Sequence, residues 1–386
     1  MDLWQFTCLS LSKLLKTQAE SRLTWVYFQP IIENVTLSEI VFAQIGANLV
    51  TIKDISKRCG YSTSTVSKAL NRSLEIGQKT TAIIQQTAME MGYLPNSAAR
   101  SLKTNRSNNL GVLFIDEMQS GLAHEYFSAV INSFKVEAER LGYDITFISH
   151  NIGNMQMSYY DHCKYRKCDG VVVACVDFND PDVVELVQSE IPTITIDHIF
   201  NDCTAILSDN LRGTKDLVNH IYASGHRKIA YIHGENTSVT KRRLAGFHKA
   251  CRALNLTVPN DYIKLARYHD PQSSGLATRE LLSLSDPPTC IMYPDDFSYI
   301  GGMNEIEKQG LSIPEDISVA GYDGIYLSQV LRPKLCTFRQ DTDALGTEAA
   351  KNLVDAIVDQ KTYIAKQIWI EGQLLVGNSV KKLDSE

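Results

Sequence analysis

Regular spacing of apolar residues begins at residue 51, where two short helical patterns lie on either side of a break at Gly60 and Tyr61. Both stretches carry apolar side chains at the three- and four-residue intervals of one helix face. These positions are Ile52, Ile55 and Cys59 in the first stretch, and Val66, Ala69 and Leu70 in the second. Ser62 or Thr63 can cap the second helix. Two short helices joined by a tight glycine turn predict a helix-turn-helix unit.

A third helix and a shorter fourth one are expected next. The third, over residues 79–91, has an apolar stripe that can close a small core over the first two helices; the stripe consists of Ile83, Ile84, Ala88 and Met91. Pro95 ends this helix, and the helix expected from residue 96 is too short to be stable alone in water. Its exposed Leu102 has basic neighbours at Arg100, Lys103 and Arg106. We expect this segment to fold in the DNA minor groove, with Leu102 as a wedge between base steps.

From residue 108 onward, short apolar runs alternate with helical segments. The runs are GVLFID at 111, ITFIS at 145, GVVVAC at 170, PTITID at 192, KIAYIHG at 228, CIMYPDD at 290 and ISVAGYDG at 317. This alternation predicts the α/β class with parallel sheets. Ligands of such sheets bind beyond the carboxyl ends of the strands.

Carboxylates stand at or just after the ends of these predicted strands, at Asp116, Asp197, Asp295, Asp296 and Asp323. If they converge on one cleft, they can accept hydrogen bonds from a polyhydroxylated ligand. Ring faces for such a ligand are offered by Tyr126, Phe127, Phe247, Tyr293 and Tyr322. Aspartate is also an ordinary helix cap and turn former, so capping is the alternative role for these side chains.

The polar face of the second helix carries the candidate DNA contacts. In a helix-turn-helix unit the start of the second helix enters the major groove. This geometry places Thr63, Ser64 and Lys68 opposite base edges, and Thr65, Ser67 and Asn71 nearer to the phosphates. Thr51 and Ser62 complete the expected set. The alternative is that these hydroxyl side chains only cap and flank a helix of some other soluble domain.

Charge is distributed unevenly along the chain. Residues 49–107 contain nine Lys or Arg and three Asp or Glu, a net charge of +6, whereas residues 108–386 have a net charge of -11. A locally positive module attracts phosphate over about one Debye length even when the whole chain is acidic. The charge pattern therefore favours a DNA-binding unit attached to an acidic body.

Composition and motifs exclude several other classes. At 386 residues and 44% hydrophobic, the chain can form two or three domains, and it contains no apolar run of the roughly 20 residues that span a bilayer. It lacks a secretory signal, and its nine scattered cysteines favour reduced thiols and a cytoplasmic location. Zinc-protease, Walker and nucleophile-elbow motifs are absent. We therefore expect no catalytic site, no metal and no cofactor.

The motifs VTIKDI, STSTVSKALN and GYLPNSAARSL within residues 50–107 resemble the DNA-binding headpiece and hinge of the lactose-repressor and galactose-repressor family of bacterial regulators. The resemblance implies base contacts at Thr63, Ser64 and Lys68, groove or backbone contacts at Asn96 and Ala99, and intercalation of Leu102. The family commonly has Arg where Lys68 stands. Because Lys lacks the bidentate fork of Arg, the operator is expected to differ at that base.

The resemblance continues more loosely after residue 108, where it implies the two-lobed periplasmic sugar-binding fold with three crossings between the lobes. The expected domains are a helix-turn-helix unit at 49–95, a hinge helix and linker at 96–107, and an effector and dimerisation domain at 108–386. One lobe is expected at about 109–207 with 338–386, and the other at 208–337. Arg243, in an Arg-x-x-Gly pattern, and Asp323, in Gly-Tyr-Asp, match effector-binding positions of the family. Asp197 and Asp295 match two further positions.

Together these features predict a transcriptional repressor of carbohydrate-use genes that binds pseudo-palindromic operator DNA and responds to a small sugar. The alternative is a regulator controlled by a protein corepressor. The family's C-terminal leucine heptads are absent, so we expect a homodimer. Residues 1–48 have no counterpart in the resemblance; the two interpretations are an added module and a mis-called start codon, and we favour the second.

Overall fold

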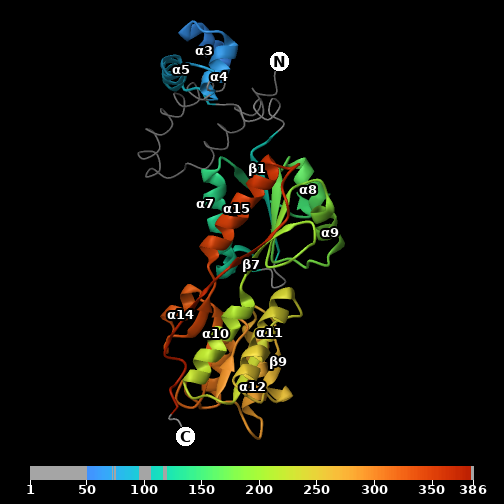
Figure 1. Cartoon of the computed structure of the whole chain (residues 1–386), viewed down its shortest axis with the longest axis vertical. Helices are drawn as coiled ribbons and strands as arrows, with labels where there is room; N and C mark the ends of the chain where they lie inside the picture. Colours follow the sequence, from blue (N-terminus) through green and yellow to red (C-terminus); the bar gives the residue numbers. More distant parts are fainter. Residues whose placement is uncertain (1–49, 72, 74, 95–105, 116–119, 384–386) are drawn as a thin grey trace, which may run out of the picture. The chain divides into compact units, whose positions relative to one another are not determined.

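The computed structural model describes residues 50–71, 73, 75–94, 106–115 and 120–383 (Figure 1). Residues 1–48, and the candidate positions Asn96, Ala99, Leu102 and Asp116, lie outside the described residues. The chain divides into two compact units, Met1–Arg100 and Ser101–Glu386.

The first unit contains the expected helix-turn-helix. Its helices are α3 (Ile52–Cys59), α4 (Thr63–Leu70) and α5 (Gln78–Glu90). Thr51 caps α3 in a capping box with Asp54, and Gly60 ends that helix with a left-handed φ of 75°, a conformation that glycine adopts without steric cost. Ser62 caps α4 by accepting from the backbone N–H of Thr65.

A small core holds these three helices together. Its buried members are Ile55, Val66, Ala69, Ile84 and Ala88. The prediction that Ile83 belongs to this core is wrong, because its side chain is 50% exposed. The helix turns by about 100° per residue, so only one of the adjacent Ile83 and Ile84 can face α3 and α4.

The second unit is built on two six-stranded sheets, one in each lobe. The first has the order β13 (Gln367–Ile370), β7 (Thr204–Ser208), β6 (Thr193–Ile196), β5 (Gly170–Ala174), β1 (Asn109–Phe114) and β2 (Asp144–Phe147), with all neighbours parallel. The second has the order β14 (Gln373–Leu375), β12 (Cys336–Arg339), β11 (Ser318–Asp323), β10 (Cys290–Met292), β8 (Ile229–His233) and β9 (Ile263–Leu265). Only β14 is antiparallel to its neighbour. These two parallel sheets confirm the predicted α/β class.

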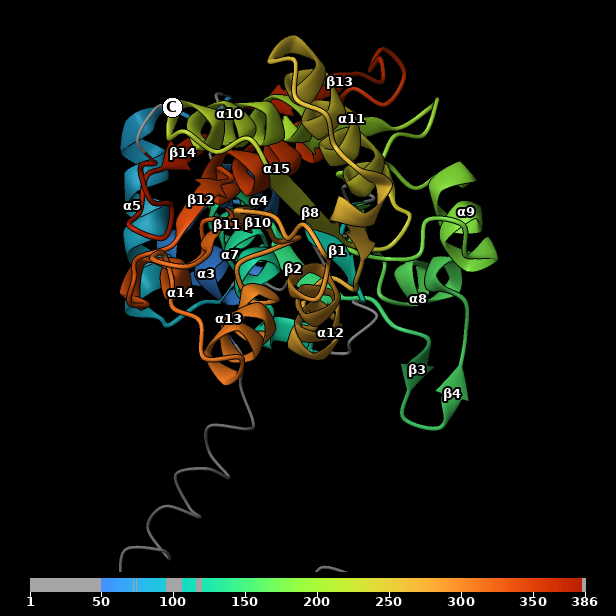
Figure 2. The same ribbon diagram turned by 90° about the horizontal axis from the view of Figure 1, so that it is seen from below.

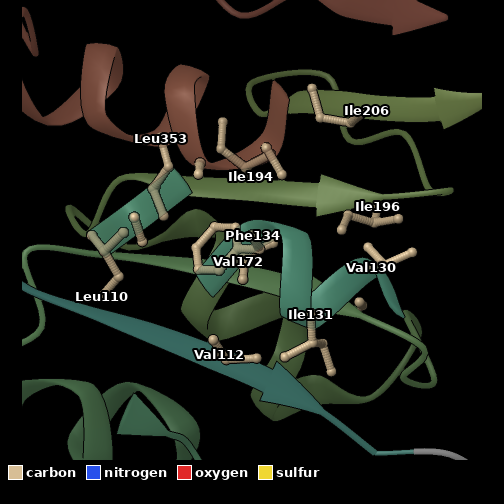
Figure 3. Packing of buried hydrophobic residues seen from close by; sticks show 14 of the residues in the cluster. Leu110, Val112, Val130, Ile131, Phe134, Val172, Ile194, Ile196, Ile206 and Leu353 are labelled. Atoms are coloured by element: carbon tan, nitrogen blue, oxygen red, sulfur yellow. The ribbon is translucent and has the colours of Figure 1, made fainter. Parts of the chain in front are cut away.

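Helices cover both faces of the first sheet. On one face α7 (Glu125–Arg140) and α15 (Thr342–Val358) lie side by side over a core that includes Val112, Phe134 and Leu353 (Figures 1 and 3). On the other face α8 (Tyr159–Tyr165) and α9 (Pro181–Gln188) pack on Val171 and Val173. Alternate residues of one strand therefore enter opposite cores, as the two-residue repeat of a strand requires.

The second sheet is also covered on both faces (Figure 2). The helices α10 (Asn210–Ala223) and α11 (Ser238–Ala253) cover one face, and α12 (Pro271–Leu282) and α13 (Tyr299–Lys308) cover the other. Smaller elements are η1 (Gly121–Ala123), η2 (Asn260–Tyr262), α14 (Tyr326–Val330) and the hairpin of β3 (Asn151–Ile152) and β4 (Met155–Gln156). The layers thus resemble those of the first lobe.

The chain passes between the sheets three times, as predicted: after β7, after β12 and after β13. The expected assignment of all of residues 338–386 to the first lobe is wrong in its last part. After α15 and β13, the chain returns to the second sheet, where β14 pairs with β12 and Ser379 O accepts from Val319 N. The edge of β12 presents backbone N–H and C=O groups that need hydrogen-bond partners, and β14 supplies them.

Candidate functional site

Polar side chains from both lobes meet where the carboxyl ends of the two sheets face each other. Asp197 follows β6 of the first lobe, Asp323 ends β11 of the second, and Gln340 lies directly after β12, at a crossing. Gln340 donates from Nε2 to Asp323 Oδ1 at 2.7 Å. Tyr126 and Arg243 complete this group, which we term the interlobe cluster.

Tyr126, near the start of α7, links the two lobes. Its phenol oxygen lies 3.3 Å from Asp197 Oδ2 and 3.3 Å from Gln340 Oε1. The Asp197 carboxylate also accepts from the backbone N–H of Ser208 at 2.8 Å. The backbone carbonyl of Asp197 accepts from Ser238 Oγ of α11 at 2.7 Å. A displacement of either lobe therefore changes the surroundings of Tyr126 and Asp197.

Arg243, on α11, is the cationic member of the cluster and is only 3% exposed. Its guanidinium donates to Asn210 Oδ1 and to Pro294 O, each at 2.7 Å, and to Asp323 Oδ1 at 3.4 Å. It also lies 3.6 Å from the centre of the Tyr322 ring. The planar, five-donor guanidinium suits such a multiple contact, whereas the ammonium of Lys does not.

Burial changes the acid–base properties of the cluster. The pKa of Asp323 rises to about 6 because the carboxylate is desolvated, an effect that Arg243 only partly offsets. Burial also raises the pKa of Asp197, with the Ser208 N–H as the main opposing influence. Both aspartates have left-handed backbone conformations, with φ of 59° at Asp197 and 98° at Asp323. Such conformations cost energy and are concentrated at functional sites.

The other aspartates at strand ends have structural partners. Asp295 accepts from the backbone N–H groups of His269 and Ser298 and from Ser298 Oγ, at 2.7 to 2.9 Å. Asp296 accepts from Thr337 Oγ1 and from Ile325 N, and burial raises its pKa well above the ordinary value. The bonds between Asp295 and Ser298 are local, as the turn-forming alternative requires, whereas Asp296 bonds to residues 29 and 41 positions away in the sequence. Asp295 is 4% exposed, and its charge lies near enough to Asp323 to raise the pKa of that carboxyl, so its expected role in effector binding stays a prediction.

Aromatic side chains form a stack beside the cluster that the sequence did not predict. His124 and His269 are stacked with ring centres 4.2 Å apart, and His269 stacks in turn on Phe297 at 4.0 Å. Phe127 contacts His124 edge-on at 4.9 Å. The other predicted ring faces, Phe247, Tyr293 and Tyr322, are each at most 2% exposed, and the Tyr322 ring faces Arg243. The missed residues Gln340, His269 and Phe297 share one signal: each follows a strand closely.

The candidate DNA contacts lie on one helix and its flanks. Thr63 and Ser64 are exposed at the start of α4, and Ser67 and Lys68 are half-buried one turn later. Several others take part in local bonds: Thr51 and Ser62 cap their helices, Thr65 bonds to Ser62, and Asn71 Nδ2 donates to Ser67 O. Lys68 Nζ forms an exposed ion pair with Glu75, which is easily exchanged for another anion.

The described residues contain neither a candidate metal site nor a membrane-spanning helix. No group of three or more His, Cys, Asp or Glu side chains in that part of the chain is arranged to hold a metal ion. None of the helices described is long and apolar enough to cross a membrane.

Comparison with known proteins agrees with this architecture. Residues 51–96 match the family model described as bacterial regulatory proteins, lacI family, and residues 218–380 match the periplasmic binding protein-like domain. The chain is 30% identical over 339 residues, 87% of its length and 99% of the relative's, to the probable HTH-type transcriptional repressor ExuR of Bacillus subtilis strain 168. The chain belongs to the lacI family. It is a helix-turn-helix transcriptional regulator.

A further relative of this lacI-family regulator is the HTH-type transcriptional repressor PurR of Mannheimia succiniciproducens, 28% identical over 87% of this chain and 100% of that protein. Among known structures, the lac repressor dimer bound to operator and the anti-inducer ONPF has a TM-score of 0.68 and 23% identity, covering 86% of this chain and 100% of that one. A complex of the transcriptional regulator CelR with cellobiose has a TM-score of 0.64 and 20% identity, covering 86% and 99%. At these identities the two structures establish the shared fold.

Proposed function

We propose that this lacI-family regulator is a homodimeric, cytoplasmic repressor whose affinity for operator DNA is controlled by a small sugar or sugar derivative bound at the interlobe cluster. The observation that carries the proposal is the cluster itself. Tyr126 and Asp197 come from one lobe and Arg243 and Asp323 from the other, so a molecule that bonds to all four stabilises one lobe arrangement over others.

The chemistry of the cluster suits a ligand with several hydroxyl groups. The carboxylates of Asp197 and Asp323 accept hydrogen bonds, the Arg243 guanidinium donates them, and Gln340 does both. Phe127 and the His124 ring provide flat apolar surfaces close by. The cellobiose complex of a structurally similar regulator supports a saccharide as the ligand class.

DNA recognition is assigned to α4. Thr63 and Ser64 are exposed at its first turn, where a helix-turn-helix unit reaches base edges, and Lys68 lies one turn further on. Asn96, Ala99 and Leu102 are proposed contacts of the hinge. A two-fold dimer requires an operator with two related half-sites, and the structurally similar lac repressor binds its operator as a dimer.

A gel-shift titration with the purified chain and the DNA upstream of its own gene tests the DNA-binding part. We expect a specific complex that weakens steeply as the salt concentration rises, because binding releases counterions from the phosphates. Absence of binding at low ionic strength to any upstream or random duplex would contradict the proposal.

Calorimetry with a fixed panel tests the ligand class. The panel contains neutral hexoses, disaccharides, hexuronates and purine bases. We expect one saccharide to bind and to change the gel shift, and we expect Arg243→Lys to weaken its binding, because Lys cannot reproduce the donor fork to Asn210 and Asp323. Binding of a purine alone would reject the sugar. A regulator that ignores the whole panel but responds to a copurifying protein would support the corepressor alternative.

A further inference from the structure

The second unit holds the chain tightly at the point where the linker from the DNA-binding unit enters it. Asp169, immediately before β5, accepts from the backbone N–H and the hydroxyl of Ser107, at 2.9 and 3.0 Å. Its second oxygen accepts from the backbone N–H of Asn108 at 2.8 Å. One carboxylate therefore fixes two consecutive linker residues through three hydrogen bonds, and bonds to an ionised acceptor are stronger than bonds between neutral groups.

Two further contacts attach the same short segment to helix ends. The Asn108 amide donates to Gly142 O, just after α7, at 3.1 Å. The Arg106 guanidinium donates to Ile357 O, in the last turn of α15, at 3.1 Å. Asn108 has a φ of 57°, a left-handed conformation that asparagine tolerates better than most residues. We term Arg106, Ser107, Asn108 and Asp169 the linker clamp.

The two helices that end at the linker clamp begin at the interlobe cluster. Tyr126 lies in the first turn of α7, and α15 starts two residues after Gln340. With 16 and 17 residues, the helices are each about 25 Å long at 1.5 Å per residue. Figure 1 shows them side by side along the first lobe.

These helices pack closely enough to move as one body. Ser133 Oγ of α7 donates to Thr342 O of α15 at 2.7 Å. At Gly346 of α15, an added Cβ would lie 2.1 Å from Ser133 Oγ and 2.3 Å from Val130 O, so only glycine fits. Backbones in such contact cannot slide past each other without breaking the interface, because packed interiors resist continuous deformation.

We propose that the linker clamp, which lies at the ends of α7 and α15, positions residues 106–108 for operator binding, and that Asp169 is its positioning residue. This inference rests on the proposed function. The clamp fixes the backbone of residues 106–108 where the linker leaves the first lobe, and residues that are already ordered lose no further conformational entropy when the chain binds DNA. Asp169 thus acts on operator binding without touching DNA.

The test compares Asp169→Ala, Asp169→Asn and the control Asp161→Ala in the full chain. Asp161 is exposed on α8 of the same lobe, so its replacement removes the same charge outside the clamp. Affinities are measured for the upstream operator duplex and for a random duplex of equal length. We expect Asp169→Ala to bind the operator about tenfold more weakly and random DNA unchanged, since non-specific binding depends mainly on phosphate charge. The control should match the wild type on both duplexes.

Asp169→Asn should recover part of the lost affinity, because its amide oxygen can still accept both bonds from Ser107 while its NH₂ group faces the N–H of Asn108. Amide hydrogen exchange provides a second readout: Ser107 and Asn108 should exchange faster in Asp169→Ala, with β1 and β5 unchanged.

If wild type binds the operator and Asp169→Ala keeps that affinity within twofold, the inference is overturned while the proposed function stands. Equal losses on operator and random DNA, or faster exchange throughout the lobe, would also overturn it by showing a general role in folding. If the wild type binds no duplex, the proposed function itself fails.

Discussion

At the scale of single residues, aspartates that all follow a strand have different roles. Asp197, Asp295, Asp296 and Asp323 all follow strands, yet Asp295 and Asp296 are bonded to backbone and hydroxyl groups of their own lobe. Asp197 and Asp323 instead approach the other members of the interlobe cluster. The difference depends on which groups the fold brings near each carboxylate, and not on the aspartate or its neighbours in sequence.

Asp323 predicts a measurable pH dependence. Its folded-state pKa of about 6 exceeds the ordinary value of 3.8, so between about pH 6 and pH 4 the folded chain binds a proton that the unfolded chain does not. The contribution of this group to the free energy of unfolding therefore increases as the pH falls through that window and is lost as the pH rises. We expect the difference in free energy of unfolding between wild type and Asp323→Asn to change by roughly 2 kcal/mol across this pH window. Urea denaturation of both chains between pH 4 and 7.5 measures this difference, and a constant value would show an ordinary pKa.

At the scale of elements, α4 shows how one short helix serves two surfaces. Val66 and Ala69 enter the small core, while Thr63 and Ser64 remain exposed on the first turn. The helix is only 8 residues long, and isolated helices of that length are not stable in water. Its capping by Ser62 and its packing on α3 and α5 therefore determine whether the polar face has a fixed geometry.

The polar face predicts a specificity effect for Lys68→Ala. A Lys contact to a guanine edge favours the correct base over other bases by on the order of 1–3 kcal/mol. A Lys contact to a phosphate instead strengthens binding to all DNA sequences by a similar amount. We expect the variant to lose about tenfold or more in operator affinity and clearly less on random DNA. The exposed Lys79 of α5 provides the matched control, since Lys79→Ala removes the same charge from another helix. Equal losses on both duplexes for Lys68→Ala would argue against base reading.

At the scale of the whole molecule, the regulatory unit is two similar α/β lobes connected by three crossings. Such lobes can change their arrangement as rigid bodies because their cores are separate: α7 and α15 pack in the first, and α10 to α13 in the second. The crossings after β7, β12 and β13 are short, so a molecule bound between the lobes acts on all of them together.

The proposed two-fold assembly makes a prediction about the operator. Two chains should bind one duplex that contains two inverted half-sites, with centres about one or more helical turns apart. Sedimentation of the complex measures the stoichiometry, and scrambling one half-site should lower the affinity sharply. A single chain that binds a single half-site as tightly as the full duplex would contradict the dimer.

The sequence by itself determined the kind of elements and their order. Apolar spacing located α3, α4 and α5, and seven apolar runs became β1, β2, β5, β6, β8, β10 and β11. These features depend on the period of side chains along a helix or strand, which is a local property of the chain. The short strands β7, β12, β13 and β14 were not singled out, because runs of three to five residues without a clear period become strands only beside a neighbour.

Only the tertiary structure decided which residues meet. Gln340 reaches Tyr126 across 214 positions, and Arg106 reaches Ile357 across 251. The sequence had offered Arg106 only as a basic neighbour of the hinge leucine, and Asp169 carried no signal at all. Contacts between distant segments depend on strand order, helix packing and chain crossings, which no local pattern encodes. For that reason the place of Gln340 in the interlobe cluster and the composition of the linker clamp could be established only from the folded chain, whereas Tyr126, Asp197, Arg243 and Asp323 were already candidates in the sequence.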